Sequence, residues 1–246
     1  ETLISSITLA DMEGNAPVET TGQVRWFKKP TPGMTYMVSL DPAMGTGGDF
    51  AAIQVFELPT FEQVGEWHHN TTPMNQQIRI LQGINKHIYD TIMEQDASAS
   101  PQIFYSMENN TIGEAALLRV MDIGEENIQG MFLSEPIRKG HRRKFRRGFN
   151  TTAKFKIDAC TKFKELIEGG KMKINSQLLI SELKDFVASG LSFKAKPGQH
   201  DDLVSACLLM TRMMKVLADF DPKIFEKWTD RTSELTPMPI FGSFTG

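Results

Sequence analysis

The order of strand-like and helical patterns constrains the fold of this chain more than any single motif does. Three strand-like runs at 36–40, 51–57 and 61–69 come first, and a short turn at Pro59 joins the last two. The later patterns are a helix at 74–95, a strand from 102 to Glu108, a helix at 112–121, a strand at 130–134, and helices at 152–168, at 177–188 and from after "KPGQHDD" to Leu217. This order predicts an α/β fold whose mixed central sheet has three antiparallel strands followed by parallel strands, with helices on both faces.

The length of 246 residues is sufficient for one sizeable core, and we expect a single domain at 34–218. Residues 1–33 are polar and interrupted by proline and glycine, so we interpret them as a leader or a linker remnant. Residues 219–246 show no clear period and are interpreted as a C-terminal extension.

The composition indicates a protein that is neither secreted nor membrane-bound. Hydrophobic residues make up 40% of the chain, charged residues make up 23%, and no apolar run approaches the ~18 residues of a membrane span. No signal peptide is visible. Cys160 and Cys207 lie in apolar helical patterns, so a disulfide framework or a cysteine-based zinc site lacks support, and a reducing compartment is expected.

Positive charge is concentrated in one stretch, although the net charge of the chain is only −3. Residues 138–156 contain no acidic side chain, and they hold nine lysines and arginines, including Lys154 and Lys156. Such a cluster is typical of a surface that binds a polyanion, and a solvated basic loop is the alternative. Interleaved phenylalanines and glycines favour a hairpin or flap. The candidate DNA contacts are Arg138, Lys139, Arg142, Arg143, Lys144, Arg146, Arg147 and Lys154.

Acidic residues lie where three predicted elements begin or end. Asp41 closes the first strand, Glu108 closes the fourth, and Asp201 and Asp202 open the last helix. Ligands collect at the carboxyl ends of strands in open α/β sheets, and a carboxylate buried there costs free energy unless it is paired or metal-bound. Oxygen ligands favour Mg²⁺ or Mn²⁺. Two such ions held ~4 Å apart can activate a water and stabilise the leaving oxygen of a phosphodiester, so the acids and the basic stretch together predict a nucleic-acid substrate.

Several of these residues also have a structural interpretation. Asp41 could cap a turn, and Asp201 could cap the helix that follows it. His68 and His69 end a strand, where paired histidines are more often polar cover than catalytic groups. His200 could orient the aspartate pair or contact a phosphate.

Three short motifs, "SLDPAMGTGGD", "YSMENN" and "GQHDDLVSACLLM", occur in this order along the chain. In their order and spacing they resemble the nuclease domain of the large terminase subunit of T4-like tailed phages. The resemblance implies an RNase H/RuvC-like fold and a two-metal endonuclease that cuts double-stranded concatemeric DNA during packaging, in the cytoplasm of the infected bacterial host. It implies a catalytic, metal-binding triad of Asp41, Glu108 and Asp202, with Asp49 at a further acidic position. From their places beside Asp202, we expect Asp201 and His200 to be auxiliary residues.

The partners that the resemblance implies are an ATPase motor domain of the same subunit, a portal and a small terminase subunit. No G-x-x-x-x-G-K-[ST] motif occurs in this chain, so it resembles the nuclease part alone. Two other functions stay open. One is an actin/Hsp70-type nucleotide-binding domain, which would need a second phosphate loop, and the other is a non-catalytic module that binds DNA or docks the motor.

Helix phasing distinguishes the two neighbouring aspartates. At ~100° per residue, the apolar residues from Leu203 to Leu217 form one broad face that must pack on the sheet. Asp202 lies at the edge of that face, whereas Asp201 projects on the polar side with Ser205 and Arg212. We therefore expect Asp202 to be the metal ligand and Asp201 to cap the helix or contact solvent.

Overall fold

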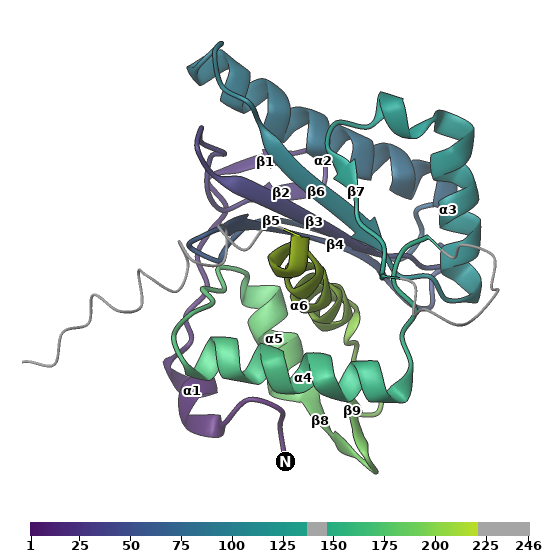
Figure 1. Ribbon diagram of the computed structural model, residues 1–246. Helices are drawn as coiled ribbons and strands as arrows, with labels where there is room; N and C mark the ends of the chain where they lie inside the picture. Colours follow the sequence, from purple (N-terminus) through teal and green to yellow (C-terminus); the bar gives the residue numbers. More distant parts are fainter. Residues whose placement is uncertain (137–146, 221–246) are drawn as a thin grey trace, which may run out of the picture.

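The computed structural model describes residues 1–136 and 147–220 and contains a seven-stranded mixed sheet with helices on both faces (Figure 1). The strand order is β1-β2-β5-β4-β3-β6-β7. β3, β4 and β5 pair in an antiparallel manner, and β6 and β7 continue the sheet in parallel beside β3, as the pattern order predicts. The strands are β1 (Glu19–Thr21), β2 (Val24–Trp26), β3 (Thr35–Asp41), β4 (Ala51–Leu58), β5 (Glu62–His69), β6 (Gln102–Met107) and β7 (Met131–Phe132).

Two groups of helices cover the two faces of the sheet (Figure 1). On one face lie α2 (Met74–Gln95), α3 (Thr111–Ile123) and the short η1 (Glu125–Asn127); on the other lie α4 (Ala153–Glu168), α5 (Gln177–Asp185) and α6 (Asp202–Phe220). α2 buries isoleucines and a leucine at helical spacing, which explains why its pattern is readable in the sequence. α6 packs directly against β3 and β4.

Alternation along β3 decides which of its side chains face α6. Leu40 belongs to the core under α2 and α3, whereas Met37 belongs to the core under α4, α5 and α6. Ser39 has the parity of Met37, and its hydroxyl donates to the carbonyl oxygen of Ala206 in α6 at 2.7 Å. Because successive side chains point to opposite faces of a strand, Asp41 is directed to the α6 side of the sheet.

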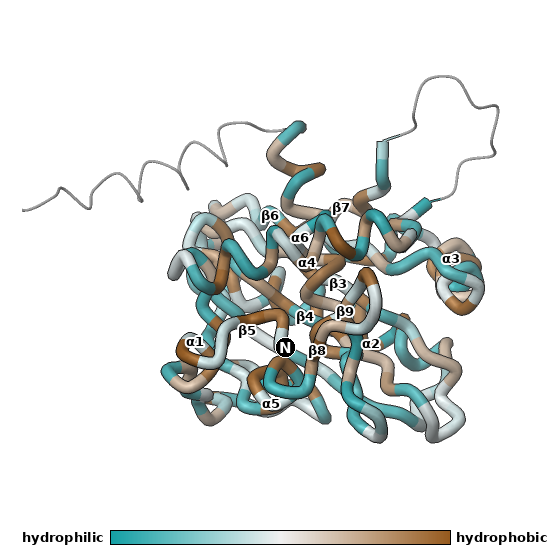
Figure 2. Tube along the Cα trace, turned by 90° about the horizontal axis from the view of Figure 1, so that it is seen from below, coloured by the Kyte–Doolittle hydropathy of each residue, from teal (hydrophilic) through white to brown (hydrophobic). Residues whose placement is uncertain are grey.

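Residues 1–33, expected to be a leader or a linker remnant, are folded onto the domain. β2 pairs with β5, and the buried Glu66 of β5 binds Arg25 of β2 at 2.8 Å. α1 (Ser6–Asp11) packs beside α5, and the backbone N–H of Leu3 donates to the carbonyl oxygen of Phe186 at 3.0 Å, so the N-terminus lies beside strand β8 (Phe186–Ser189; Figure 2). The sequence does not reveal these pairings, because the buried apolar residues of the segment, among them Ile4, Leu9 and Trp26, are too few and too widely spaced to form a period.

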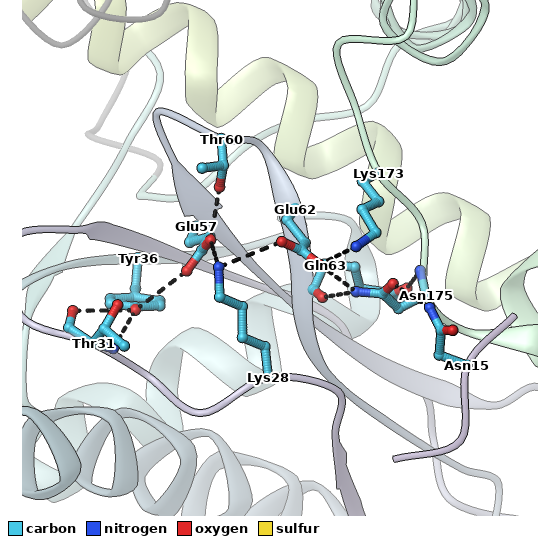
Figure 3. A network of polar contacts seen from close by, with 10 residues as sticks. All are labelled: Asn15, Lys28, Thr31, Tyr36, Glu57, Thr60, Glu62, Gln63, Lys173 and Asn175. Carbon is cyan, nitrogen blue, oxygen red and sulfur yellow. Dashed lines mark hydrogen bonds and ion pairs between the residues drawn. The ribbon is translucent and has the colours of Figure 1, made fainter. Parts of the chain in front are cut away.

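A polar network holds the same segment to the end of β4 and to the strand-like 173–175 stretch (Figure 3). Lys28 lies 2.5 Å from the fully buried Glu57 and 3.4 Å from Glu62. Glu62 also forms an ion pair with Lys173 at 2.8 Å. Burial of Glu57 is therefore compensated by a cation from the N-terminal segment, which gives this segment a structural role in the domain.

The C-terminal half differs from the sequence prediction at one helix end. α5 stops at Asp185, and residues predicted to continue the helix form β8 (Phe186–Ser189), which pairs with β9 (Ser192–Ala195) in a two-stranded hairpin. Gly190 takes a φ of 60° in the connecting turn, a conformation that favours glycine. β7 covers only part of the predicted 130–134 strand, and α6 extends to Phe220. No helix in the described part of the chain has both the length and the apolar character needed to cross a bilayer.

Candidate functional site

Asp41 and Glu108 lie side by side where two parallel strands end. Leu40 of β3 is paired with Met107 of β6, and the N–H of Glu108 donates to the carbonyl oxygen of Leu40 at 3.2 Å. The two carboxyl groups are neighbours, so they repel one another when both are ionised. Burial and the adjacent Glu108 carboxylate raise the pKa of Asp41 well above its usual range. The pair is therefore a site where a cation can replace a proton.

Asn110 orients the Glu108 carboxylate, a role that sequence reasoning missed. Its side-chain N–H donates to Oε2 of Glu108 at 3.1 Å, and its Oδ1 accepts from the N–H of Gly113 at 2.8 Å. The second bond caps α3, because Asn110 is the N-cap residue of that helix. The signal was present in the sequence, since an acid followed by two asparagines ends the "YSMENN" motif.

Asp202 is the first residue of α6 and lies near the Asp41 carboxyl group. Its Oδ2 atom is buried and has no hydrogen-bond partner within the described residues, and the nearest cationic candidate is His200, whose Nδ1 lies 3.6 Å away. Burial and the neighbouring Asp201 raise the pKa of Asp202 to about 6, against the effect of a hydrogen bond from the Phe50 backbone. Asp49 lies in an exposed loop, and its negative charge raises the pKa of Asp202 less than Asp201 does. An unpartnered buried carboxylate oxygen is an atom that a cation would satisfy.

Asp201 does not cap α6 in the predicted way. Its Oδ2 accepts from the backbone N–H of Ala195 in β9 at 3.2 Å. The first turn of α6 is capped by Glu182 of α5 instead, which accepts from the N–H of Val204 at 3.1 Å. Burial raises the pKa of Glu182 to about 8, and nearby Asp202 acts in the same direction. The helix end is therefore held by a residue that sequence proximity could not identify.

A pocket of about 190 Å³ connects the Asp41–Glu108 pair with α4 and α6. Ser205 and Arg212, which helix phasing assigned to a solvent-facing polar side, line this pocket. These two side chains do not face open solvent, because α4 packs against that side of α6. The polar side of α6 therefore forms one wall of the pocket. The lining residues are Asp41, Glu108, Thr151, Lys156, Ala159, Ser205, Leu208, Leu209 and Arg212.

The stem of the predicted basic flap is anchored at the same place. Arg212 of α6 forms an ion pair with Glu135 on one side of the flap and donates to the carbonyl oxygen of Asn150 on the other side at 3.0 Å. Phe149 forms an isolated parallel β-bridge with Glu108. Of the predicted DNA contacts, Arg147 forms an ion pair with Glu125, and Lys154 is exposed on α4. The others lie outside the described residues: Arg138, Lys139, Arg142, Arg143, Lys144 and Arg146.

The histidines near the sheet edge have structural partners. His68 stacks on Phe50 with ring centroids 4.1 Å apart, and burial lowers its pKa to about 4, so its imidazole is neutral. His69 shares a 2.6 Å hydrogen bond with Thr72. His200 is half-exposed and meets Phe50 edge-on, which places it beside Asp202.

The described residues contain no three Asp, Glu, His or Cys side chains that already surround one metal position. The donor set nevertheless fits a hard divalent cation, because Asp41 and Glu108 are adjacent acids and Asp202 has a buried oxygen without a hydrogen-bond partner among the described residues. All three residues supply only oxygen ligands.

An antiparallel β3–β4–β5 meander continued by parallel β6, with acids at the ends of β3 and β6 and at the start of α6, defines an RNase H-like domain. Residues 38–213 match the family described as "Terminase RNaseH-like domain", and the chain belongs to this family. This match excludes the actin/Hsp70-type interpretation.

Solved structures with the same fold come from phage and human cytomegalovirus terminases. The large terminase nuclease from thermophilic phage G20c with bound magnesium has a TM-score of 0.62 and 16% identity, and the match covers 86% of this chain and 96% of that one. The Thermus phage P74-26 large terminase nuclease domain has a TM-score of 0.60 and 16% identity, with 85% and 93% coverage. The human cytomegalovirus terminase nuclease domain, soaked with Mn and inhibitor-bound, has a TM-score of 0.53 and 13% identity, with 85% and 93% coverage.

Proposed function

We propose that this chain is a metal-dependent endonuclease that hydrolyses phosphodiester bonds of double-stranded DNA. The observation that carries the proposal is the Asp41–Glu108 pair, whose two acids adjoin at the ends of β3 and β6. Two adjacent acids are unfavourable when both are ionised, so the site favours a divalent cation over an empty, fully ionised state. Membership in the terminase family and the metal-bound relatives support the same function.

In this proposal, Asp41, Glu108 and Asp202 hold two Mg²⁺ or Mn²⁺ ions. The ions supply the activation of a water and the stabilisation of the leaving 3′ oxygen. The chain contributes orientation: Asn110 fixes Glu108, the strand end fixes Asp41, and Glu182 fixes the start of α6 next to Asp202. Asp49, Asp201 and His200 act as auxiliary residues that adjust the field around Asp202.

The biological setting follows from the family. We propose that the chain is the nuclease part of a phage terminase large subunit, cutting concatemeric viral DNA in the cytoplasm of the infected bacterium. Its partners would be the ATPase motor of the same subunit, the portal and the small terminase subunit. The basic flap would grip the duplex through its phosphates, because a cluster of lysines and arginines binds the backbone regardless of sequence.

Conversion of a supercoiled plasmid to nicked and linear forms tests this function. We expect cleavage with Mg²⁺ or Mn²⁺, no cleavage with excess EDTA, and restoration when the metal is added back. Asp41→Ala protein purified in parallel controls for a contaminating nuclease. Equal cleavage by the variant, or none by the parent under any metal condition, would contradict the proposal; binding of DNA without cleavage would favour the non-catalytic module.

A further inference from the structure

The pocket beside the carboxylate pair contains two cations whose environments differ. Arg212 is already saturated: it pairs with Glu135, donates to Thr151 Oγ1 at 3.2 Å and to Asn150, and lies over the rings of Phe149 and Phe155 at 5.2 and 4.9 Å. Its guanidinium therefore holds the stem of the flap and has little capacity left for a ligand.

Among the described residues that line this pocket, Lys156 is the cation without an ionic partner. It projects from the second turn of α4, and its Nζ atom lies 5.6 Å from the centroid of the buried Phe186 ring. Within the described residues it forms no ion pair, although the pocket also contains Asp41 and Glu108. The aromatic ring restrains the ammonium by a cation–π contact without neutralising its charge.

The rest of the pocket has the composition expected of a nucleotide subsite. Thr151 and Ser205 bring hydroxyl groups, and Ala159, Leu208 and Leu209 provide an apolar wall. Hydroxyls and an ammonium bind phosphate oxygens, whereas an apolar wall suits the edge of a sugar. A volume of about 190 Å³ exceeds several times the ~30 Å³ that one water occupies, so the space is larger than a hydration site.

We propose that this pocket binds one phosphodiester unit of the strand to be cut, with its phosphate on Lys156, Thr151 and Ser205. The proposal rests on the nuclease function proposed above and adds a substrate contact to it. Lys156 lines the same pocket as the acids, so its positive charge attracts the polyanion to a place where the carboxylates alone would repel it. It thereby sets the position of the strand relative to Asp41 and Glu108.

The binding experiment is done in an Asp41→Ala background, so that cleavage does not interfere. Affinity for a short DNA duplex is measured from about 50 to about 200 mM salt. Lys156→Ala should lower affinity roughly tenfold at low salt and reduce the log–log salt slope by about one unit, the contribution of one bound phosphate. Lys162→Ala removes the same charge from the same helix, where Lys162 pairs with Glu165 at 3.3 Å outside the pocket, and it should leave the slope unchanged. Lys156→Arg should keep the parent slope.

Cleavage is measured separately in proteins that retain Asp41. Lys156→Ala should lower the rate at saturating DNA by roughly tenfold or more, and Lys156→Arg should recover most of it. Melting temperatures check folding, and Lys156→Gln replaces Lys156→Ala if the alanine variant melts early. A salt slope of Lys156→Ala or Lys156→Gln equal to that of Lys162→Ala overturns the pocket assignment. Absence of cleavage in the parent instead refutes the nuclease function, and the binding result still decides the pocket.

Discussion

Glu182 in α5 accepts a hydrogen bond from the backbone N–H of Val204 in α6 at 3.1 Å. The N–H at this position of a helix is usually satisfied by the N-cap side chain, which here is Asp201. Asp201 binds Ala195 of β9 instead. The two acids thus connect α6 to α5 and to the β8–β9 hairpin, and they hold Asp202 in place at the start of the helix.

This relationship predicts how the stability of the metal-free protein depends on pH. Burial raises the pKa of Glu182 from its ordinary value of 4.5 to about 8, so the folded protein holds a proton that the unfolded chain releases. The resulting stabilisation is complete below the ordinary pKa and is lost as the pH rises through about 8. Asp202 and Asp41, whose pKa values are also raised, act in the same direction.

Glu182→Gln should therefore flatten the fall in unfolding free energy between about pH 5 and pH 9, and it should stabilise the protein at the alkaline end by about 1–3 kcal/mol. The amide can still accept from Val204. Glu182→Ala removes the acceptor and should cost about 1–2 kcal/mol at pH 5. Denaturant unfolding in EDTA at several pH values measures both effects, and an identical pH slope in the glutamine variant and the parent would refute the explanation.

Asp41→Ala and Glu108→Ala should each abolish cleavage while leaving affinity for DNA within about twofold of the parent, because the basic surface is unchanged. Plasmid nicking and duplex binding are measured on the same preparations. Asn110→Ala, which frees the Glu108 carboxylate, should lower the rate less severely. Substantial residual cleavage by Asp41→Ala or Glu108→Ala would remove that residue from the metal site.

Asp202→Asn should eliminate nearly all cleavage and weaken binding of Mg²⁺ or Mn²⁺, because the buried Oδ2 atom has no hydrogen-bond partner among the described residues. Asp201→Asn should retain a measurable rate, since its amide oxygen can still accept from Ala195. Cleavage kinetics and metal titration by calorimetry compare the two variants. The reverse order of activities would transfer the ligand role to Asp201.

The basic flap should bind phosphates in a manner that is independent of sequence. Replacing Arg142, Arg143 and Arg146 together with alanine should lower affinity for all duplexes alike and flatten the log–log salt dependence by roughly one unit for each phosphate that is no longer bound. Arg147→Ala should have a smaller effect, because Arg147 already pairs with Glu125. Affinity is measured as a function of salt concentration for two unrelated duplexes. An unchanged slope in the triple variant would contradict phosphate binding and favour the alternative interpretation, a solvated basic loop.

The sequence by itself determined the order of the main strands and helices from β3 to α5 and two acids of the candidate site. Short-range periodicity is sufficient for this, because alternation along a strand directs a side chain to one face whatever lies beyond it. Asp41 and Glu108 each follow a readable apolar strand, and parallel pairing of β3 with β6 brings them together.

Tertiary structure alone decided which distant residues support these acids. Glu182 accepts a hydrogen bond from Val204, and Arg212 forms an ion pair with Glu135. Arg25 likewise pairs with Glu66 at the N-terminal segment. Each pair joins residues far apart in the chain through polar contacts that leave no period in the sequence. The packing of α4 against α6 likewise converted a polar helix side into the pocket that contains Lys156. A local pattern reports only which face of an element is apolar; what covers the polar face depends on the path of the whole chain.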